Sequence, residues 1–236
     1  MPHRWSSAAQ IRREQIESGR DVTFNRVFLP YYTSAVNNLG CRSLLEVGCG
    51  TGHLSKHLSQ LIPVVHAIEP SPGMHEVSTA VLLETGVELV KCKLEDFNGD
   101  RKFDCVLSHL CGHVVAHLDS FLRDCSKWLA DGGTFIFSLP HPCFWNDYQP
   151  YFDPKEFDYA SECFTSATLT ISKARDEKMT GLPFHHRPIG RYVESIVAAR
   201  LVIRRFDEIF PPAGIQALYP APWKRPHFCV FHVTLT

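Results

Sequence analysis

The sequence predicts an α/β protein with a doubly wound, mainly parallel sheet of seven strands, and three observations support this. Short apolar runs alternate with helical patterns from residue 43 onward, as in βαβ units whose strands are buried between helices. The first run leads directly into a glycine-rich turn at 48–52, and open parallel sheets bind ligands beyond such strand ends. The length of 236 residues, 44% of them apolar, is enough for one sizeable core.

Seven apolar segments form the predicted strands, at residues 43–47, 64–68, 87–90, 103–108, 134–139, 201–210 and 227–235. Helical patterns separate them, at residues 51–61, 72–83, 118–130 and 191–199. In the first of these helices, Leu54, Leu58 and Leu61 recur at helical spacing and would share one face. Because parallel strands are buried on both sides, we expect helices on both faces of the sheet.

We expect residues 1–236 to form a single domain with four parts. These are an N-terminal helical lid, a ligand-binding core, an insertion after the fifth strand that caps the substrate, and a C-terminal helix with the last strands, at residues 1–38, 39–140, 141–190 and 191–236. In the lid, Asp21 or Thr23 could cap a second helix, which Pro30 either bends or begins. The insertion is rich in proline, histidine and aromatic residues and has no clear period.

Charge and cysteine content exclude several classes of function. Lysine and arginine total 24 against 25 aspartates and glutamates, a net charge of −1, and no basic run offers a nucleic acid or a membrane surface a binding site. The nine cysteines include no C-x-x-C pair, so we expect buried thiols in a reducing compartment. No run of about 18 apolar residues occurs. We expect a cytoplasmic monomer or homodimer that acts on a small molecule.

The chemistry of the chain begins at the sequence Glu46-Val47-Gly48-Cys49-Gly50-Thr51-Gly52. Its three glycines let the backbone turn tightly and approach a ligand where a Cβ would clash. A dinucleotide-binding loop would have a glycine three residues after Gly50, but His53 stands there. The pattern E-x-G-x-G-x-G instead resembles the first motif of class I methyltransferases that use S-adenosylmethionine (SAM).

The resemblance extends beyond this loop. The second strand ends at Glu69, and an acid in this position can accept both hydroxyls of a ribose. In the family, an acid after the third strand often meets the adenine amino group. This chain has Lys93 where many members have an acid, so the role would fall to Glu95 or Asp96.

Further segments are similar to the family, namely Phe103-Asp104-Cys105-Val106-Leu107-Ser108, the turn 129–135 and the tail 225–230. The segments 20–25, 141–144 and 186–188 resemble a small-molecule, ubiquinone-methyltransferase-like subset. The resemblance covers residues 40–140 well and the rest loosely. It implies a Rossmann-like fold, SAM as cofactor and S-adenosylhomocysteine (SAH) as product.

The resemblance and the strand ends together indicate which residues bind the cofactor. We expect contacts from Glu46, Gly48, Cys49, Gly50, Gly52, Glu69, Pro70, Met74, Leu94, Glu95, Ser108, His109 and Arg13. All except Arg13 follow or end a predicted strand or begin the next helix. Arg13 lies in the lid, where it could bind the methionine carboxylate of SAM or remain a solvated helix residue.

Three histidines are candidates for a catalytic role: His113, His141 and His186. An imidazole with a pKa of about 6.5 can accept a proton from a hydroxyl or amine near neutral pH. For substrate contacts we expect Arg187, which could clamp a carboxylate, and Phe24, Tyr31 and Phe144, which together with Trp5, Trp145 and Tyr148 could wall an apolar pocket. For these residues, packing or a salt bridge that holds the cap closed is the alternative.

Two rival hypotheses remain open, as does the methylated atom. His109, His113 and His117 are spaced by four, but no carboxylate motif accompanies them, so we expect no metal. The pattern leaves O-, N- and C-methylation possible. A SAM-dependent cyclase or a SAM-binding regulatory partner would keep the cofactor site without methyl transfer, and a nicotinamide-dependent oxidoreductase would replace the cofactor.

Overall fold

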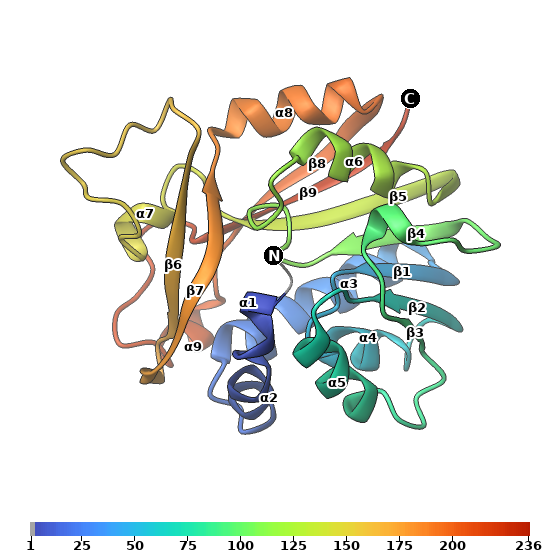
Figure 1. Ribbon diagram of the computed structural model, residues 1–236, viewed down its shortest axis with the longest axis horizontal. Coiled ribbons are helices and arrows are strands. Elements are labelled where there is room, and N and C mark those ends of the chain that lie inside the picture. The colour runs from blue at the N-terminus through green and yellow to red at the C-terminus, as the bar shows by residue number, and fades with distance from the viewer. Residues whose placement is uncertain (1–2) are drawn as a thin grey trace.

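The computed structural model describes residues 3–236, and its centre is a seven-stranded sheet (Figure 1). The strand order is β3-β2-β1-β4-β5-β9-β8. The strands are β1 Ser43–Val47, β2 Val64–Ile68, β3 Glu88–Val90, β4 Phe103–Ser108, β5 Leu129–Pro140, β8 Leu201–Ile209 and β9 Phe228–Leu235. The first five are parallel, and β9 pairs antiparallel with both β5 and β8. The predicted fold class is confirmed.

Helices cover both faces of the sheet. Two of them, α6 (Leu118–Ser126) and α8 (Ile189–Ala198), pack together with β4 and β5 in one apolar core. On the other face, α3 (Leu29–Leu39) and α4 (His53–Leu58) share a second core. Helix α5 (Pro72–Val81) packs beside α4. In the described residues 3–236, no helix combines the length and apolarity needed to cross a membrane.

The N-terminal segment contains shorter helices than its polar sequence suggests. Residues 3–17 form two short helices, α1 (His3–Ser6) and α2 (Ala9–Glu17). The backbone N–H of Phe24 donates to Asp21 Oδ1 at 2.9 Å, so Asp21 rather than Thr23 provides the cap. A π-helical turn, Phe24–Phe28, then leads into α3, where Pro30 lies in the first turn. Pro30 therefore begins a helix, where its missing N–H costs nothing.

The insertion contains structure that its composition did not predict. After α7 (Trp145–Tyr148), β6 (Cys163–Ile171) and β7 (Ala174–His186) form a long antiparallel hairpin that is separate from the main sheet. Its register shifts twice, which interrupts the alternation that would reveal a strand. A short helix, α9 (Ala213–Gln216), lies in the predicted C-terminal loop.

Polar contacts join the hairpin to the N-terminal helices, which lie beside it in Figure 1. Arg4 Nη1 donates to Ser166 Oγ at 3.2 Å and to the Gly181 carbonyl at 3.3 Å. The amide of Gln15, fully buried in α2, donates to Glu177 Oε2 at 3.1 Å. These contacts hold α1, α2 and the hairpin together over the carboxyl edge of the sheet.

Candidate active site

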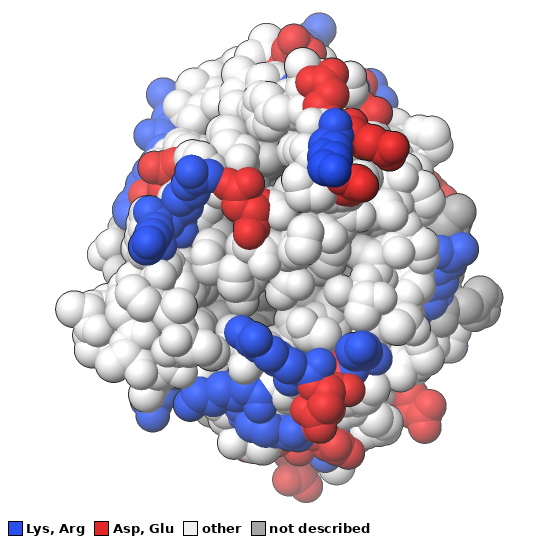
Figure 2. Space-filling view, turned by 90° about the vertical axis from the view of Figure 1, so that its left-hand side faces the viewer, with Lys and Arg blue, Asp and Glu red and all other residues white. Residues whose placement is uncertain are grey.

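A cavity of about 690 Å³ lies beyond the carboxyl ends of the parallel strands. Because β1 lies between β2 and β4, the order of connections reverses there, and this is where open α/β sheets bind ligands. One part, the glycine-loop end, is lined by residues after β1, β2 and β3: Glu46–Thr51, Glu69–Ser71 and Lys93–Glu95. Figure 2 shows the face that carries α7 and the hairpin, with a mostly uncharged, hollowed surface between clusters of charged side chains.

Each of the three positions in the loop requires glycine for a different structural reason. All three have positive φ angles, 74° at Gly48, 57° at Gly50 and 79° at Gly52, which side chains rarely tolerate. A Cβ at Gly48 would lie 2.6 Å from Cys111 Sγ, whereas one at Gly50 would meet nothing within 4 Å. Gly52 does not line the cavity, and a Cβ there would lie 3.0 Å from Ser78 Cβ of α5. Gly52 therefore serves helix packing and not direct ligand contact.

Glu69 lies at the junction of the glycine loop and α5. Its Oε2 accepts the backbone N–H of Gly50 and its Oε1 that of Ser71, both at 2.8 Å. Burial raises the pKa of this carboxyl to about 7, although the two N–H groups favour the charged form. Each carboxylate oxygen retains a lone pair for a ligand hydroxyl, and Glu69 lines the cavity.

A second buried acid, Glu46, accepts a hydrogen bond from the Ser55 hydroxyl. Burial raises its pKa to about 8, and the charge of Glu69 adds to the shift. Glu46 therefore holds a proton at neutral pH. It lines the cavity together with other predicted cofactor residues: Gly48, Cys49, Gly50, Pro70, Met74, Leu94, Glu95 and His109.

The loop after β3 distinguishes the two acids that the sequence left open. Leu94–Asp96 form a single 3₁₀ turn. Glu95 lines the cavity and pairs with Lys93 Nζ at 2.9 Å, whereas Asp96 is not part of the lining. The geometry therefore favours Glu95 for any contact with a bound ligand.

His109 follows β4 and lines the cavity beside the glycine loop. Its Nδ1 is hydrogen-bonded to Tyr32 Oη and Ser138 Oγ, both at 3.0 Å. Among the residues that the structure describes, Nε2 has no hydrogen-bond partner. Because the ring is enclosed by protein, its pKa falls to about 3. His109 is therefore a neutral imidazole at pH 7, held in one orientation. The neighbouring Ser108 Oγ donates to the Val47 carbonyl at 3.2 Å and lies outside the cavity lining.

Of the three predicted catalytic histidines, only His113 lines the cavity. His141 Nε2 lies 3.2 Å from Glu208 Oε1, and its ring stacks on Phe144 with centroids 4.7 Å apart. His186 Nε2 contacts the Tyr159 carbonyl at 2.9 Å. The structure thus separates His141, Phe144 and His186 from the large cavity, because each is held by partners of the insertion or the last strands.

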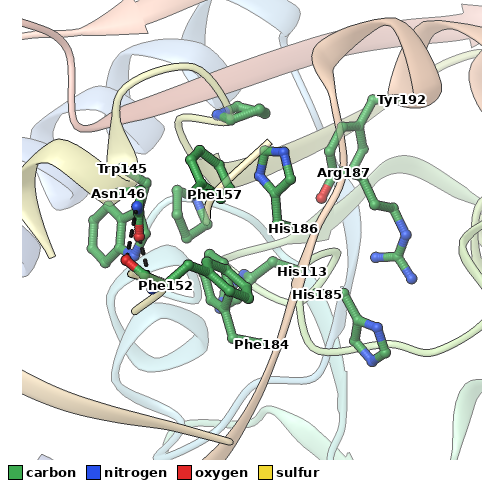
Figure 3. A pocket seen from close by; sticks show the side chains of 12 residues that line it. His113, Trp145, Asn146, Phe152, Phe157, Phe184, His185, His186, Arg187 and Tyr192 are labelled. Atoms are coloured by element: carbon green, nitrogen blue, oxygen red, sulfur yellow. Dashed lines mark hydrogen bonds between the residues drawn. The ribbon is translucent and has the colours of Figure 1, made fainter. Parts of the chain in front are cut away.

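Figure 3 shows a second, small hollow, around which His113, Phe152, Phe184 and His186 gather. Its volume of about 10 Å³ holds about one water molecule, so it cannot contain a substrate. Arg187, predicted to clamp a substrate, lies at its border and is 3% exposed. Its guanidinium donates to three backbone carbonyls, those of Gly112 at 3.2 Å, Val115 at 2.8 Å and Ala116 at 3.0 Å. Arg187 therefore holds the insertion against the loop after β4.

Two other predicted contacts also lie elsewhere. Arg13 Nε pairs with Glu17 at 2.9 Å on an exposed face of α2. The neighbouring Arg12 lines the cavity instead and pairs with Asp21 at 2.7 Å. Tyr31 Oη donates to Asp207 Oδ2 at 2.5 Å and contacts His232 Nε2, so it packs on the outer strands. Phe24, by contrast, lines the cavity as expected.

Most of the opposite part of the cavity was not predicted from the sequence. We call it the aromatic end, and its rings come from the π-helical turn, α7 and the segment after it, the hairpin and β9: Phe24, Phe28, Trp145, Tyr151, Phe184 and Phe228. These residues are far apart in the sequence, so no local motif joins them. Of these rings, Phe24 and Trp145 belonged to the predicted apolar wall, and Phe28 shares the helical pattern of Phe24.

Comparison with known proteins agrees with this geometry. A family model described as a methyltransferase domain matches residues 45–137. The chain is 29% identical over 98 residues to malonyl-[acyl-carrier protein] O-methyltransferase of Priestia megaterium. The matched region covers 41% of this chain and 36% of that protein. It is 31% identical over 122 residues to ubiquinone biosynthesis O-methyltransferase of Xanthomonas axonopodis pv. citri, which covers 48% and 49%. The matches thus span less than half the length of these relatives.

Solved structures of methyltransferases share the fold. The crystal structure of a SAM-dependent methyltransferase from Mesorhizobium loti superimposes with a TM-score of 0.66 at 21% identity and covers 85% of this chain and 95% of that chain. This likeness concerns the fold. Together, the comparisons show that residues 45–137 are similar to a methyltransferase domain and that the fold is that of SAM-dependent methyltransferases.

Proposed function

We propose that the protein transfers the methyl group of SAM to an O, N or C atom of a small molecule and releases SAH. One observation carries this proposal: a single cavity joins the glycine loop and Glu69 to a second, aromatic compartment. Its volume of about 690 Å³ lies in the range of about 300–1,000 Å³ that is usual for ligand sites. A protein that only bound SAM would not need the aromatic compartment.

In this proposal the glycine-loop end holds the cofactor. The Glu69 carboxylate accepts hydrogen bonds from the two ribose hydroxyls, because each of its oxygens keeps one lone pair beyond the one that accepts a backbone N–H. At Gly48 and Gly50 the absence of a side chain lets the protein backbone approach the cofactor closely. Leu94 and Glu95 border the adenine. The methionine part then extends past Glu46 and His109 toward the aromatic end.

The reaction is an in-line displacement at the methyl carbon. A lone pair of the acceptor forms the new bond to carbon, the carbon–sulfur bond breaks, and its electron pair stays on sulfur to give neutral SAH. The proton that a hydroxyl or amine loses is finally released to solvent. Since the thioether leaves readily, the main task of the protein is placement, with the reacting atoms about 3–3.5 Å apart. His109 and His113 border this point and can orient the acceptor.

We further infer a role in specialised metabolism, as a cytoplasmic monomer or homodimer in which residues 1–236 act as one domain. Among the curated relatives, one is named for methylation of malonyl-[acyl-carrier protein] and one for ubiquinone biosynthesis, which favours biosynthetic acceptors over nucleic acid. The nine cysteines, all within the described residues, are free, which is typical of a reducing compartment.

Calorimetric titration with SAH tests the proposal, and the Glu69→Gln variant provides the control. We expect one SAH per chain with micromolar affinity, and a loss of about tenfold or more in the variant, because an amide accepts the hydroxyls less strongly than a carboxylate. NADH titrated under the same conditions tests the oxidoreductase alternative. Binding of NADH without binding of SAH would refute the proposal.

A further inference from the structure

The aromatic end contains an unbroken row of rings that runs between two of the histidines lining the cavity, His109 and His113. Successive ring centroids are 4.5, 5.1, 5.2, 6.0, 4.9 and 5.3 Å apart in the order His109, Phe28, Phe228, Trp145, Tyr151, Phe184 and His113. Every one of these rings lines the cavity. We call this row the aromatic wall. Centroid separations of 4.5–7 Å are those of interacting aromatic rings, so the wall is one continuous surface.

The sheet topology places this wall beside the cofactor end. Phe228 begins β9 and pairs with Pro140 at the carboxyl end of β5, and His109 directly follows β4. The glycine loop follows β1, which is the neighbour of β4 on the other side. A molecule that lies against the wall therefore extends toward the place where the methyl group of SAM would lie.

No lysine or arginine charge is free to meet a ligand at the wall. Among the described residues that line the cavity, the lysine and arginine side chains are Lys93, which pairs with Glu95, and Arg12, which pairs with Asp21. Enclosure by protein lowers the pKa of both His109 and His113 to about 3. Both rings are therefore neutral at pH 7, and a carboxylate or phosphate buried here would lack a counter-ion, which is costly.

The same reasoning disfavours a cation. Aromatic walls attract ammonium groups, but Asp21, the acid that could balance one at this end, is already neutralised by Arg12 at 2.7 Å. The sulfonium of SAM would also repel a second positive charge across a short distance in a medium of low dielectric constant. A neutral ring has neither cost and gains the contact area of the wall.

We propose that the acceptor is a neutral, ring-containing molecule whose flat face packs against the aromatic wall and whose hydroxyl or amine meets an imidazole at one end of that wall, His109 or His113. This inference rests on the proposed function and adds the substrate class to it. The wall supplies most of the binding surface, and the neutral imidazole supplies the polar contact that orients the nucleophile.

A matched series of probes tests the charge of the acceptor. Three fluorescent naphthols share one fused ring and one hydroxyl: 2-naphthol is neutral, 6-hydroxy-2-naphthoate is anionic, and 6-(aminomethyl)-2-naphthol is cationic. Each is titrated into the full chain saturated with SAH. We expect the neutral probe to bind at least about tenfold more tightly than either charged probe, a difference of about 1.4 kcal/mol. Equal or tighter binding of a charged probe, or no binding of 2-naphthol, would overturn the inference.

Two substitutions on one hairpin locate the binding surface. Phe184 belongs to the wall, whereas Phe164 lies on the outer part of the hairpin and is 49% exposed. We expect Phe184→Ala to weaken 2-naphthol binding about fivefold or more, from lost ring contact, and Phe164→Ala to leave it unchanged. Phe184→Leu keeps most of the volume and should give an intermediate loss. Equal losses in Phe184→Ala and Phe164→Ala would overturn the placement.

The SAH titration distinguishes a wrong substrate class from a wrong proposed function. If SAH binds and Glu69→Gln weakens it, but the anionic or cationic probe is preferred, the substrate class is wrong and the proposed function stands. If SAH does not bind to the folded wild-type chain, both are wrong. Unchanged SAH affinity in the Phe184 variants shows that these variants have kept the fold.

Discussion

The two ends of the cavity are built in different ways. The glycine-loop end comes from short segments at consecutive strand ends, and its ligand contacts are largely backbone groups and two buried acids, Glu46 and Glu69. The aromatic end is assembled from the π-helical turn, α7, the hairpin and β9, and its lining consists of side-chain rings. One end is defined by backbone conformation and the other by side-chain packing.

This difference explains what each end can tolerate. Few residues other than glycine tolerate a left-handed backbone conformation. Few residues other than an acid can accept the backbone N–H groups that Glu69 binds. A ring surface can change one ring at a time, because apolar contacts are non-directional. We therefore expect substitutions at the glycine-loop end to affect cofactor binding and folding sharply, and substitutions at the aromatic end to affect acceptor choice by degrees.

The largest effect is expected for Gly48→Ala. The new Cβ would occupy a backbone conformation with φ of 74° and lie 2.6 Å from Cys111 Sγ. A left-handed conformation costs about 1–2 kcal/mol and overpacking about 1–3 kcal/mol. We expect the free energy of unfolding, measured in urea, to fall by about 2–4 kcal/mol.

Gly50→Ala is the matched control, because φ is also positive there but the Cβ meets nothing within 4 Å. It should lose only the conformational term of about 1–2 kcal/mol, while its Cβ enters the cavity and weakens SAH binding. If both variants lost equal stability, the contact with Cys111 would have no energetic importance. The double variant Gly48→Ala/Cys111→Ala should recover part of the loss.

The same difference determines how far the sequence could predict the site. The strands and the residues after them were predictable because a period of apolar residues and a glycine pattern are local signals, and most of the predicted residues between Glu46 and His109 line the cavity. The hairpin was not, because its register shifts twice and because Pro183, a residue untypical of strand interiors, lies within β7. Tertiary packing decided that Arg12, and not Arg13, faces the cavity. No sequence period distinguishes two neighbouring arginines on a polar helix.

An intermediate effect is expected from pH on SAH binding. Burial raises the pKa of Glu69 in the free protein to about 7, and the charged carboxylate is the better acceptor for ribose hydroxyls. SAH affinity should therefore rise as pH increases through 7, by up to about tenfold between pH 6 and pH 8, in proportion to the ionised fraction. Calorimetry at both pH values measures this change.

Glu69→Gln serves as the control for the pH effect, because the amide does not titrate. Any dependence that remains in the variant belongs to other groups, and one of these is Glu46, whose pKa is about 8. Linkage gives a second check. A raised pKa means that the folded, ligand-free protein retains a proton that the unfolded chain has lost, so stability falls as pH rises from about 4.5 through 7. The variant should lack this part of the decline in melting experiments.

The smallest effect concerns the charge balance of the aromatic end. Asp21 neutralises Arg12 at 2.7 Å, and its other oxygen accepts the Phe24 N–H. Asp21→Asn can keep the second contact while it leaves the Arg12 charge uncompensated beside the cavity. We expect the anionic 6-hydroxy-2-naphthoate to gain about two- to fivefold in affinity, the range of a partly exposed ion pair, and 2-naphthol to be unaffected.

Glu17→Gln is the control for this prediction, since it removes an acid of α2 whose partners are Arg13, outside the cavity lining, and His53, which follows the glycine loop and lies away from the aromatic wall. It should leave the affinities of both probes unchanged. Equal gains in Asp21→Asn and Glu17→Gln would mean that the overall field of the helix, and not the local pair, sets the preference. No gain in Asp21→Asn would mean that the neutrality of the aromatic end does not depend on Arg12. Either outcome would mean that the charge preference of the aromatic end is not determined by the Arg12–Asp21 pair. The aromatic end would then differ less from the glycine-loop end than the structure implies.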